Sequence, residues 1–161
     1  MKEKEYNRQK VLEYANKWAL SRNPKYYDYE KIGGDCTNFI SQCIYAGSEV
    51  MNYNSWYYKN ANNKSPSWTG VEFLYNFLTQ NKSVGPRGKE VSQNQIQVGD
   101  LIQLSSNGEK FTHSLIVVGI GNVNYLSDIY IATHSYDALG RTVSTYDFKK
   151  IRFVHVENVY I

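Results

Sequence analysis

The sequence predicts an α+β fold, with helices in the first half of the chain and a mainly antiparallel sheet in the second. Up to about residue 80, apolar residues recur at helical spacing. Beyond that point the pattern changes to short apolar or alternating runs rich in β-branched residues, separated by turn signals. Helices followed by strands are typical of the α+β class. The length of 161 residues fits a single domain spanning 1–161.

The first two helices are each predicted with their own end signals. An amphipathic helix over 6–21 ends at Asn23-Pro24, because the residue before a proline is displaced from the α region. A second helix of about three turns follows, with Asp35 as its N-cap and Gly47 as the glycine just past its C-terminus.

The third helix is predicted to begin at a capping box formed by Thr69 and Glu72 and to end near Gln80. A polar loop over 48–67 precedes it, long enough to suggest a functional role. Residues 81–98 are rich in Gly, Pro, Ser and Gln and are expected to form another loop.

The second half is expected to supply a sheet of four to six strands, packed against the N-terminal helices. Asn107-Gly108 predicts a hairpin turn between the first two strands, and 146–148 is a candidate edge strand. The expected strands are 101–104, 113–120, 129–133 and 151–156.

The composition excludes several classes of protein. Hydrophobic residues make up 42% and charged residues 20%, which are globular values, not those of a disordered chain or coiled coil. No stretch approaches the ~20 apolar residues of a membrane span. A net charge of +3 without a dense basic run does not indicate nucleic-acid binding. The 15 tyrosines suit a groove that holds a polar polymer or a peptide, although aromatic residues on a wet surface would look the same.

Cys36 is the residue with the sharpest chemistry. It follows Gly33-Gly34-Asp35 and falls in the first turn of the second helix, where unpaired N–H groups and the helix dipole favour a thiolate. The same N–H groups could form an oxyanion hole. A buried structural cysteine is the alternative, and it fits Cys43 well. The two cysteines would lie two turns apart on one helix, about 10 Å along its axis, which is too far for a disulfide.

Two histidines lie where a base for Cys36 is needed. His113 opens one predicted strand and His134 follows the next, so an antiparallel pairing brings both to one edge of the sheet. His155 lies inside the last apolar run and is interpreted as structural. With only three histidines and no Cys-x-x-Cys pair, no metal site or other cofactor is expected.

Three motifs stand out in the chain: Gly34-Asp35-Cys36-Thr37-Asn38-Phe39, then Gly99-Asp100 before a strand, and His113-Ser114-Leu115-Ile116-Val117. Together they resemble the putative amidase domain family of bacterial cell-envelope proteins. That family is grouped with the papain-like NlpC-type and CHAP peptidoglycan hydrolases. The resemblance implies a papain-like cysteine hydrolase with Cys36 as nucleophile, His113 as base, and His134 as the residue that orients His113. Asp137 is the alternative third member.

The implied reaction is hydrolysis of an amide bond through an acyl-thioester, in the stem peptide of the cell wall or between muramic acid and alanine. Four candidates for substrate binding lie around the nucleophile: Tyr26, Asp35, Asn38 and Trp56. Each also has a structural interpretation, as a helix cap for Asp35, a loop hydrogen bond for Asn38 and core packing for the aromatic residues.

The expected partner is peptidoglycan or a peptide, with no nucleic acid and no membrane, and a monomer is expected. The start MKEKEYNRQK lacks the apolar core of a signal peptide. The resemblance implies an extracellular or cell-wall protein whose export signal lies outside this sequence, and a cytoplasmic location stays open. Two other functions also stay open: a catalytically silent cell-wall binding module, and a cysteine hydrolase or transferase of intracellular peptides.

Overall fold

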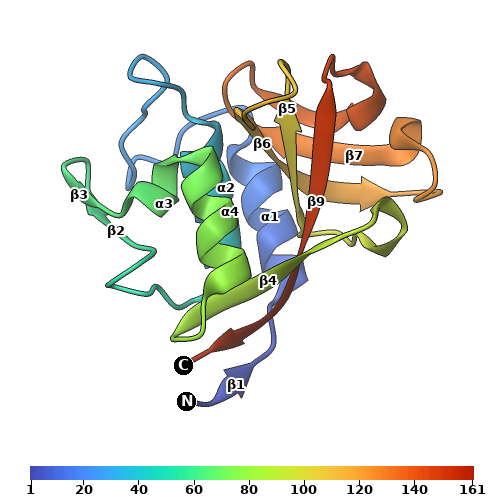
Figure 1. The fold of residues 1–161 in the computed structure, drawn as a ribbon. Helices are drawn as coiled ribbons and strands as arrows, with labels where there is room; N and C mark the ends of the chain where they lie inside the picture. The colour runs from blue at the N-terminus through green and yellow to red at the C-terminus, as the bar shows by residue number, and fades with distance from the viewer.

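The computed structural model describes residues 1–161 and confirms the α+β class, with helices gathered on one side of a mainly antiparallel sheet (Figure 1). The helices are α1 (Arg8–Trp18), α2 (Cys36–Ser48), α3 (Pro66–Thr69) and α4 (Val71–Gln80). The strands are β1 (Glu3–Lys4), β2 (Tyr58–Asn60), β3 (Asn63–Lys64), β4 (Gly85–Val91), β5 (Leu101–Ser105), β6 (His113–Ile120), β7 (Ile129–Thr133), β8 (Ala138–Thr142) and β9 (Lys150–Tyr160).

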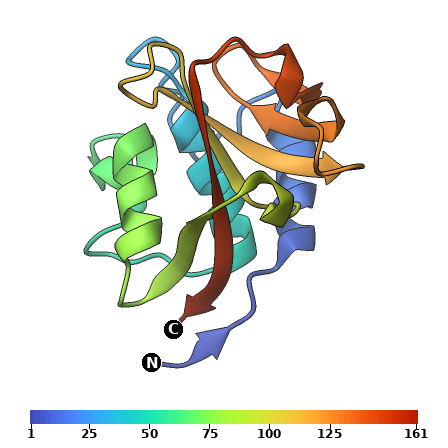
Figure 2. The same cartoon turned by 45° about the vertical axis from the view of Figure 1, so that its right-hand side comes forward.

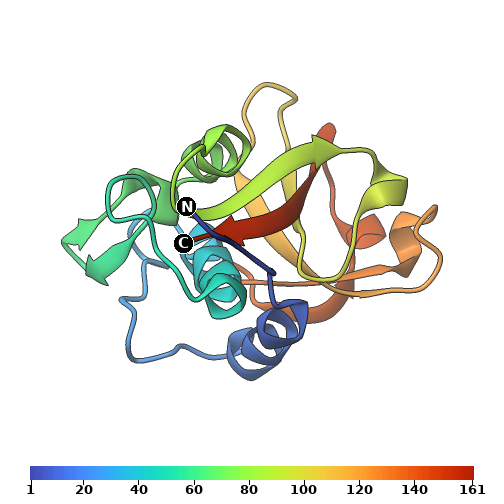
Figure 3. The same ribbon diagram turned by 90° about the horizontal axis from the view of Figure 1, so that it is seen from below.

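The main sheet has seven strands in the order β1-β9-β5-β6-β7-β8, and β4 also pairs with β9. All of these pairings are antiparallel. The long strand β9 joins two parts of the sheet, because its first half pairs with β5 and its second half with β4 and β1 (Figure 2). The pairing of β1 with the end of β9 brings the two chain termini together (Figure 3).

Both faces of the sheet are buried, which explains why its central strands carry apolar residues on both faces. One face packs against α1, α2 and α4, and the opposite face is covered by the segments that contain Ile96 and Val143. The face toward the helices includes Leu101, Ile116, Ala132 and Val154. The opposite face includes Ile102, Leu115, Val117, Ile131 and Phe153. None of the helices combines the length and apolar character needed to cross a membrane.

The first helix forms inside its expected range. Asn7 is its N-cap, with a side chain that accepts a hydrogen bond from the Lys10 amide at 3.1 Å. The helix ends at Trp18, three residues before the end of the expected range 6–21. The second helix starts at Cys36, as expected, which places the sulfur in the first turn.

The expectation for Gly47 was wrong. The helix runs through Gly47 to Ser48, and the residue with left-handed conformation is Glu49, with φ of 59°. A Cβ atom at Gly47 would lie 2.5 Å from a methyl carbon of Val11 on α1. Glycine is needed here for the close approach of α1 and α2, not to end the helix.

The capping box at Thr69 and Glu72 was also wrong. Thr69 ends the one-turn helix α3, and Gly70 is the N-cap of α4 without a side-chain hydrogen bond. The Glu72 carboxylate instead pairs with Arg152 of β9 at 3.1 Å. A tertiary ion pair has thus replaced a local cap.

The sheet is larger than the predicted four to six strands because β1, β4 and β8 were missed. Strand β4 lies inside the expected loop 81–98, and its sequence contains two glycines and a proline without a period of two. It forms because it pairs along its whole length with β9, which extends to Tyr160. Residues 146–148, the candidate edge strand, are not a strand, and β8 takes the edge position beside β7.

Gly47→Ala should destabilise the fold by about 1–3 kcal/mol, because the added methyl group collides with α1. The neighbouring change Ala46→Gly is the control, since it should cost about 1 kcal/mol through helix propensity alone. Urea unfolding measures both. A Gly47→Ala protein that is more stable than wild type would show that propensity governs this position and that the helices are not in tight contact.

Candidate active site

Cys36 lies at the N-terminus of α2 and is almost buried, with 8% of its surface exposed. No side chain caps this helix, so its first-turn N–H groups lack a side-chain acceptor. The preceding Gly33 and Gly34 have φ of 89° and 99°, a left-handed conformation that favours glycine. The loop therefore delivers Cys36 to the first turn of the helix, as predicted, but the expected side-chain cap from Asp35 is absent.

The protonation state expected for Cys36 is not the one that this environment favours. Burial raises the pKa of the Cys36 thiol, and hydrogen bonds from the backbone of Ser114 and Thr37 only partly oppose this effect. The charge of Asp35 acts in the same direction as burial. Desolvation outweighs the helix N-terminus, so Cys36 rests as a thiol.

His113 opens β6 and lines the same cavity as Cys36, a space of about 490 Å³. Burial, with a smaller contribution from the charge of Arg141, lowers the pKa of His113 from 6.5 to about 4. The ring is therefore neutral at pH 7, which is the state that a base requires. The structure has no hydrogen bond between the ring and the Cys36 sulfur, whose nearest polar side-chain partner is the Thr37 hydroxyl at 3.8 Å.

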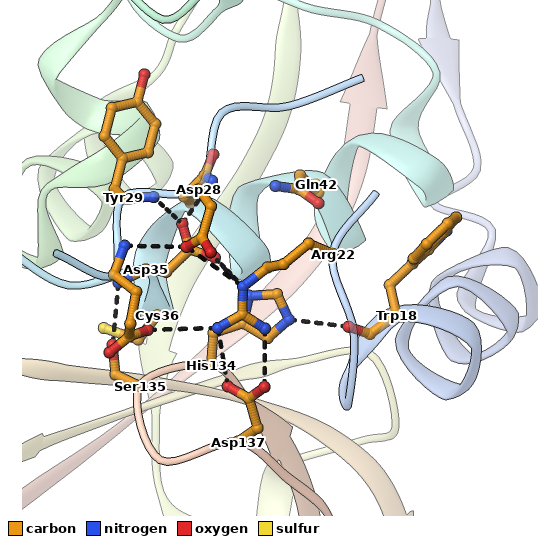
Figure 4. Close-up of polar contacts among 12 residues, drawn as sticks. Trp18, Arg22, Asp28, Tyr29, Asp35, Cys36, Gln42, His134, Ser135 and Asp137 are labelled. Carbon is orange, nitrogen blue, oxygen red and sulfur yellow. Dashed lines mark hydrogen bonds and ion pairs between the residues drawn. The ribbon is translucent and has the colours of Figure 1, made fainter. Parts of the chain in front are cut away.

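His134 does not orient His113, so the predicted hydrogen bond between them was wrong. Its Nδ1 lies 2.5 Å from a carboxylate oxygen of Asp35 and its Nε2 lies 2.8 Å from the Trp18 carbonyl oxygen (Figure 4). The ring stacks on Phe39 at a centroid distance of 4.1 Å. Both ring nitrogens of His134 are therefore engaged by Asp35 and Trp18, and neither is free to hold His113.

The register of the sheet explains why the two histidines do not meet. Ile116 of β6 pairs with Ala132 of β7, and the same register places His134 opposite Ser114. Successive side chains on a strand point to opposite faces. The His134 side chain thus points toward the helices, whereas the His113 side chain points to the opposite face of the sheet. His113 lines the cavity because it lies at the end of β6.

Asp137, the alternative third residue, is held elsewhere. Its carboxylate oxygens accept two hydrogen bonds from Arg22, at 2.8 and 3.1 Å. Arg22 also lies within 3.5 Å of carboxylate oxygens of Asp28, Glu30 and Asp35. Burial alone would lower the pKa of Arg22, but the carboxylates of Asp137, Asp28 and Asp35 together raise it. Neither His134 nor Asp137 is hydrogen-bonded to His113, so the structure supports a pair of residues and leaves the third role unfilled.

Asp35 and Asn38, expected to bind substrate, are structural. The Asp35 side chain does not cap the helix; its second oxygen accepts hydrogen bonds from the Tyr29 amide at 2.9 Å and the Asn38 side chain at 2.8 Å. Asn38 also donates to the Tyr27 carbonyl and accepts from the Trp68 indole at 3.0 Å. All of these groups are satisfied within the protein.

The aromatic candidates for the groove wall belong to the core. Trp56 is fully buried, donates to the Ser41 hydroxyl at 3.2 Å and packs against Trp68 at 4.8 Å. The Tyr26 ring stacks on the Trp68 ring, with 6.0 Å between the ring centroids. None of the four predicted substrate-binding residues lines the cavity of Cys36.

Part of the cavity wall comes from a segment of the chain that sequence reasoning missed. Ser135 and Tyr136, in the turn after β7, have left-handed φ values of 62° and 65° and line the cavity. Arg141 of β8 and Tyr146 line it further along. The one available signal was the short run of residues 138–142, which reads as a strand only once β7 is placed.

Buried polar groups fix the start of α2 against the sheet. The Thr37 hydroxyl lies 2.9 Å from that of Ser114, which accepts from the Gln103 amide at 3.2 Å. The Gln103 oxygen in turn accepts from Arg152 at 2.9 Å. These hydrogen bonds join Thr37 to Ser114, the residues that directly follow Cys36 and His113 in sequence. They therefore help to fix the position of Cys36 relative to His113.

Two other cavities lack a cysteine. One of about 520 Å³ lies beside α4 among Asn, Ser and Phe side chains, and one of about 480 Å³ lies beside Arg8 and His155. At the latter, His155 and Arg8 each lie 2.8 Å from the buried carboxylate of Asp100, which explains the Gly99-Asp100 motif structurally. No group of three or more His, Cys, Asp or Glu side chains is placed to hold a metal ion.

The chain belongs to a recognised family of domains. The model of the putative amidase domain family matches residues 5–156, so the chain belongs to that family. It is 34% identical over 120 residues to the uncharacterized protein YhbB of Bacillus subtilis (strain 168). This alignment covers 71% of the chain but only 37% of YhbB. No solved structure gives a significant match.

His134→Ala should destabilise the protein by about 3–5 kcal/mol, because it leaves the buried Asp35 carboxylate without its closest partner. His155→Ala is the control, since Asp100 keeps Arg8 and backbone amides as donors and should lose only about 1 kcal/mol. Chemical unfolding at neutral pH measures both. Equal losses would show that the His134 contact contributes no more than a partly exposed one.

His113 should make stability depend on pH between about 4 and 6.5. In that window the unfolded chain binds a proton at this ring and the folded protein does not, so the free energy of unfolding falls as the pH falls. The slope should be shallower in His113→Gln, while the two proteins run parallel above pH 7. Urea titrations at half-unit pH steps measure this, and identical slopes at low pH would show that the folded ring titrates normally.

Proposed function

We propose that the chain is a cysteine-dependent amide hydrolase of papain-like type. The observation that carries this proposal is that Cys36, at a helix N-terminus, and His113, at a strand end, line one cavity. A nucleophile and a neutral base in one partly enclosed space are the minimum for acyl transfer. Membership of the putative amidase domain family supports an amide as the bond that is cleaved.

The reaction begins with neutral partners. His113 accepts the Cys36 proton as the sulfur attacks the carbonyl carbon, and the imidazolium returns that proton to the leaving amine. This releases the amine and leaves an acyl-thioester on Cys36. A water molecule, deprotonated by His113, then attacks the thioester, and the acid product and the thiol are released.

The first turn of α2 is suited to stabilise the negative oxygen that forms during both attacks. Its N–H groups have no side-chain acceptor, and the helix dipole places partial positive charge there. The absence of a capping side chain thus supports a catalytic use of this helix end. The Thr37–Ser114 hydrogen bond would hold this end in place as the charge develops.

We further propose that the substrate is cell-wall peptidoglycan, cleaved in the stem peptide or at the muramoyl–alanine amide. The basis is the resemblance of the Asp35-Cys36-Thr37-Asn38 and His113-Ser114 segments to cell-wall hydrolases. On this proposal residues 1–161 act as one monomeric domain at or outside the cell wall.

A binding module without catalysis is the competing function, and one observation favours it. The Cys36 thiol is almost buried, burial raises its pKa, and no hydrogen bond links it to His113. Catalytic hydrogen bonds are often loose until the substrate is bound, so the two functions are separated by activity rather than by this geometry.

Cys36→Ala and His113→Ala should each abolish digestion of purified cell walls, whereas Cys43→Ala should leave turnover largely intact. Cys43 is fully buried on the apolar face of the same helix, so its truncation should cost only on the order of 1 kcal/mol of stability. Turbidity of a wall suspension gives the rate, and mass spectrometry of the products identifies the bond.

Cys43→Ala is the matched control, because it removes the same atom from the same helix. An equal loss of rate in both cysteine variants, at equal folded fraction, would contradict Cys36 as the nucleophile. Wall binding without cleavage by the wild-type protein would favour the binding module.

A further inference from the structure

We propose that Arg141 is a specificity-determining residue, which binds a carboxylate of the substrate beside the bond that Cys36 attacks. This inference rests on the proposed function and adds the substrate class to it: amides that carry a free carboxylate close to the scissile carbonyl. Arg141 lines the same cavity as Cys36 and His113.

Charge is the first support. Nine residues line this cavity, and Arg141 is the one among them that is ionised at neutral pH. The His113 ring is neutral because its pKa is about 4, and burial keeps Cys36 a thiol. No Asp or Glu lines the cavity. A ligand therefore meets a single uncompensated positive charge.

The second support is that Arg141 lacks the partner that most other arginines of this chain have. Arg8, Arg22 and Arg152 each form an ion pair with a carboxylate. Arg141 forms none, although its carbon chain leads it into a partly enclosed site. A guanidinium in such a place is suited to an external carboxylate or a similar anion.

The third support is that the guanidinium is already fixed. Its Nε donates to the Thr145 hydroxyl at 2.7 Å, one terminal nitrogen donates to the Thr145 carbonyl at 2.9 Å, and its central carbon lies 3.7 Å from the Tyr146 ring centre. The other terminal nitrogen makes no hydrogen bond within the protein. A side chain held in this way loses little entropy when it binds a ligand.

Carboxylate binding would also act on the base. The charge of Arg141 is the second cause, after burial, of the low pKa of His113. The ionisable groups that share the cavity with this ring are Cys36, Tyr136, Arg141 and Tyr146. A bound carboxylate offsets Arg141, so the ring becomes more basic when the substrate is in place.

The test compares two alkylating reagents of similar size, iodoacetate and iodoacetamide, which differ in charge. In the wild-type protein the rate ratio of iodoacetate to iodoacetamide at Cys36, measured by mass spectrometry at low ionic strength, should fall roughly fivefold or more in Arg141→Gln. A change in the thiol pKa alters both rates equally and cancels in the ratio. Arg141→Lys keeps the charge and should retain most of the wild-type ratio.

Arg87→Gln is the matched control, because Arg87 also stacks on a tyrosine, forms no carboxylate pair, and lies outside the cavity. Its ratio should equal that of wild type. A ratio that does not change in Arg141→Gln would overturn the proposal. If Arg141→Gln fails to fold, acetate and acetamide at equal concentration replace it as protectants of wild-type Cys36. Acetate should then slow labelling more than acetamide, and equal protection would overturn the proposal.

The outcome is independent of whether amide hydrolysis occurs, since alkylation requires only the thiol. Walls that are digested by a protein with an unchanged ratio would leave the proposed function standing without the carboxylate subsite. A ratio that falls in Arg141→Gln, in a protein that digests no wall, would leave the anion subsite and contradict the hydrolase. If both hold, conversion of the carboxyl groups of the wall peptides to carboxamides should slow wild-type digestion and have little effect on Arg141→Gln.

Discussion

The buried hydrogen bond between Asp35 and His134 is the interaction on which the site depends. Both side chains are about 1% exposed, and His134 also donates to the last residue of α1, Trp18. The contact joins the end of one helix, the start of the next and the end of β7, which are far apart in sequence. Because Cys36 follows Asp35 directly, the contacts that hold this carboxylate also hold the proposed nucleophile. The Asp35 amide adds a further link by donating to the Ser135 hydroxyl at 2.9 Å.

The contact between Asp35 and His134 contributes more to the positioning of these segments than to the free energy of unfolding. Burial of the His134 ring and the Asp35 side chain removes two polar groups from water, and the contact between them returns about as much as that removal costs. Its value lies in geometry, since few arrangements of the three segments satisfy both ring nitrogens and both carboxylate oxygens. His134, which the sequence suggested as a catalytic residue, instead holds the segment that carries Cys36 in position.

Burial also determines the protonation states of Cys36 and His113. It keeps Cys36 a thiol and His113 a neutral imidazole, so the site carries no preformed thiolate–imidazolium pair. A resting thiol is less exposed to oxidation and alkylation than a thiolate would be. On the proposed mechanism, the Cys36 proton moves to His113 when a substrate carbonyl is in place, which couples reactivity to occupancy of the cavity.

Much of the fold could be predicted from the sequence, because apolar periodicity reports on burial. The starts of α2 and β6 and the full extent of β7 were found in this way, and so was the cavity-lining pair Cys36 and His113. The features that could not be predicted depend on tertiary partners. Strand β4 forms because it pairs with β9, and Glu72 forms an ion pair with Arg152 instead of a local helix cap. The side chain of His134 faces the helices through a register that no local pattern encodes. Arg141 could not be identified from the sequence for a similar reason, because its strand β8 forms only by pairing with β7.

The direction of β9 separates the two ends of the molecule. His113 pairs with Leu104 of β5, and Leu104 pairs with Ile151 near the beginning of β9, so the cavity lies at that end of the sheet. Both chain termini lie at the other end, where Tyr160 pairs with Glu3. Any segment attached to either terminus would leave from the side opposite the cavity mouth. The domain can therefore be tethered at one end while the cavity at the other end stays open to the large, insoluble polymer proposed as substrate.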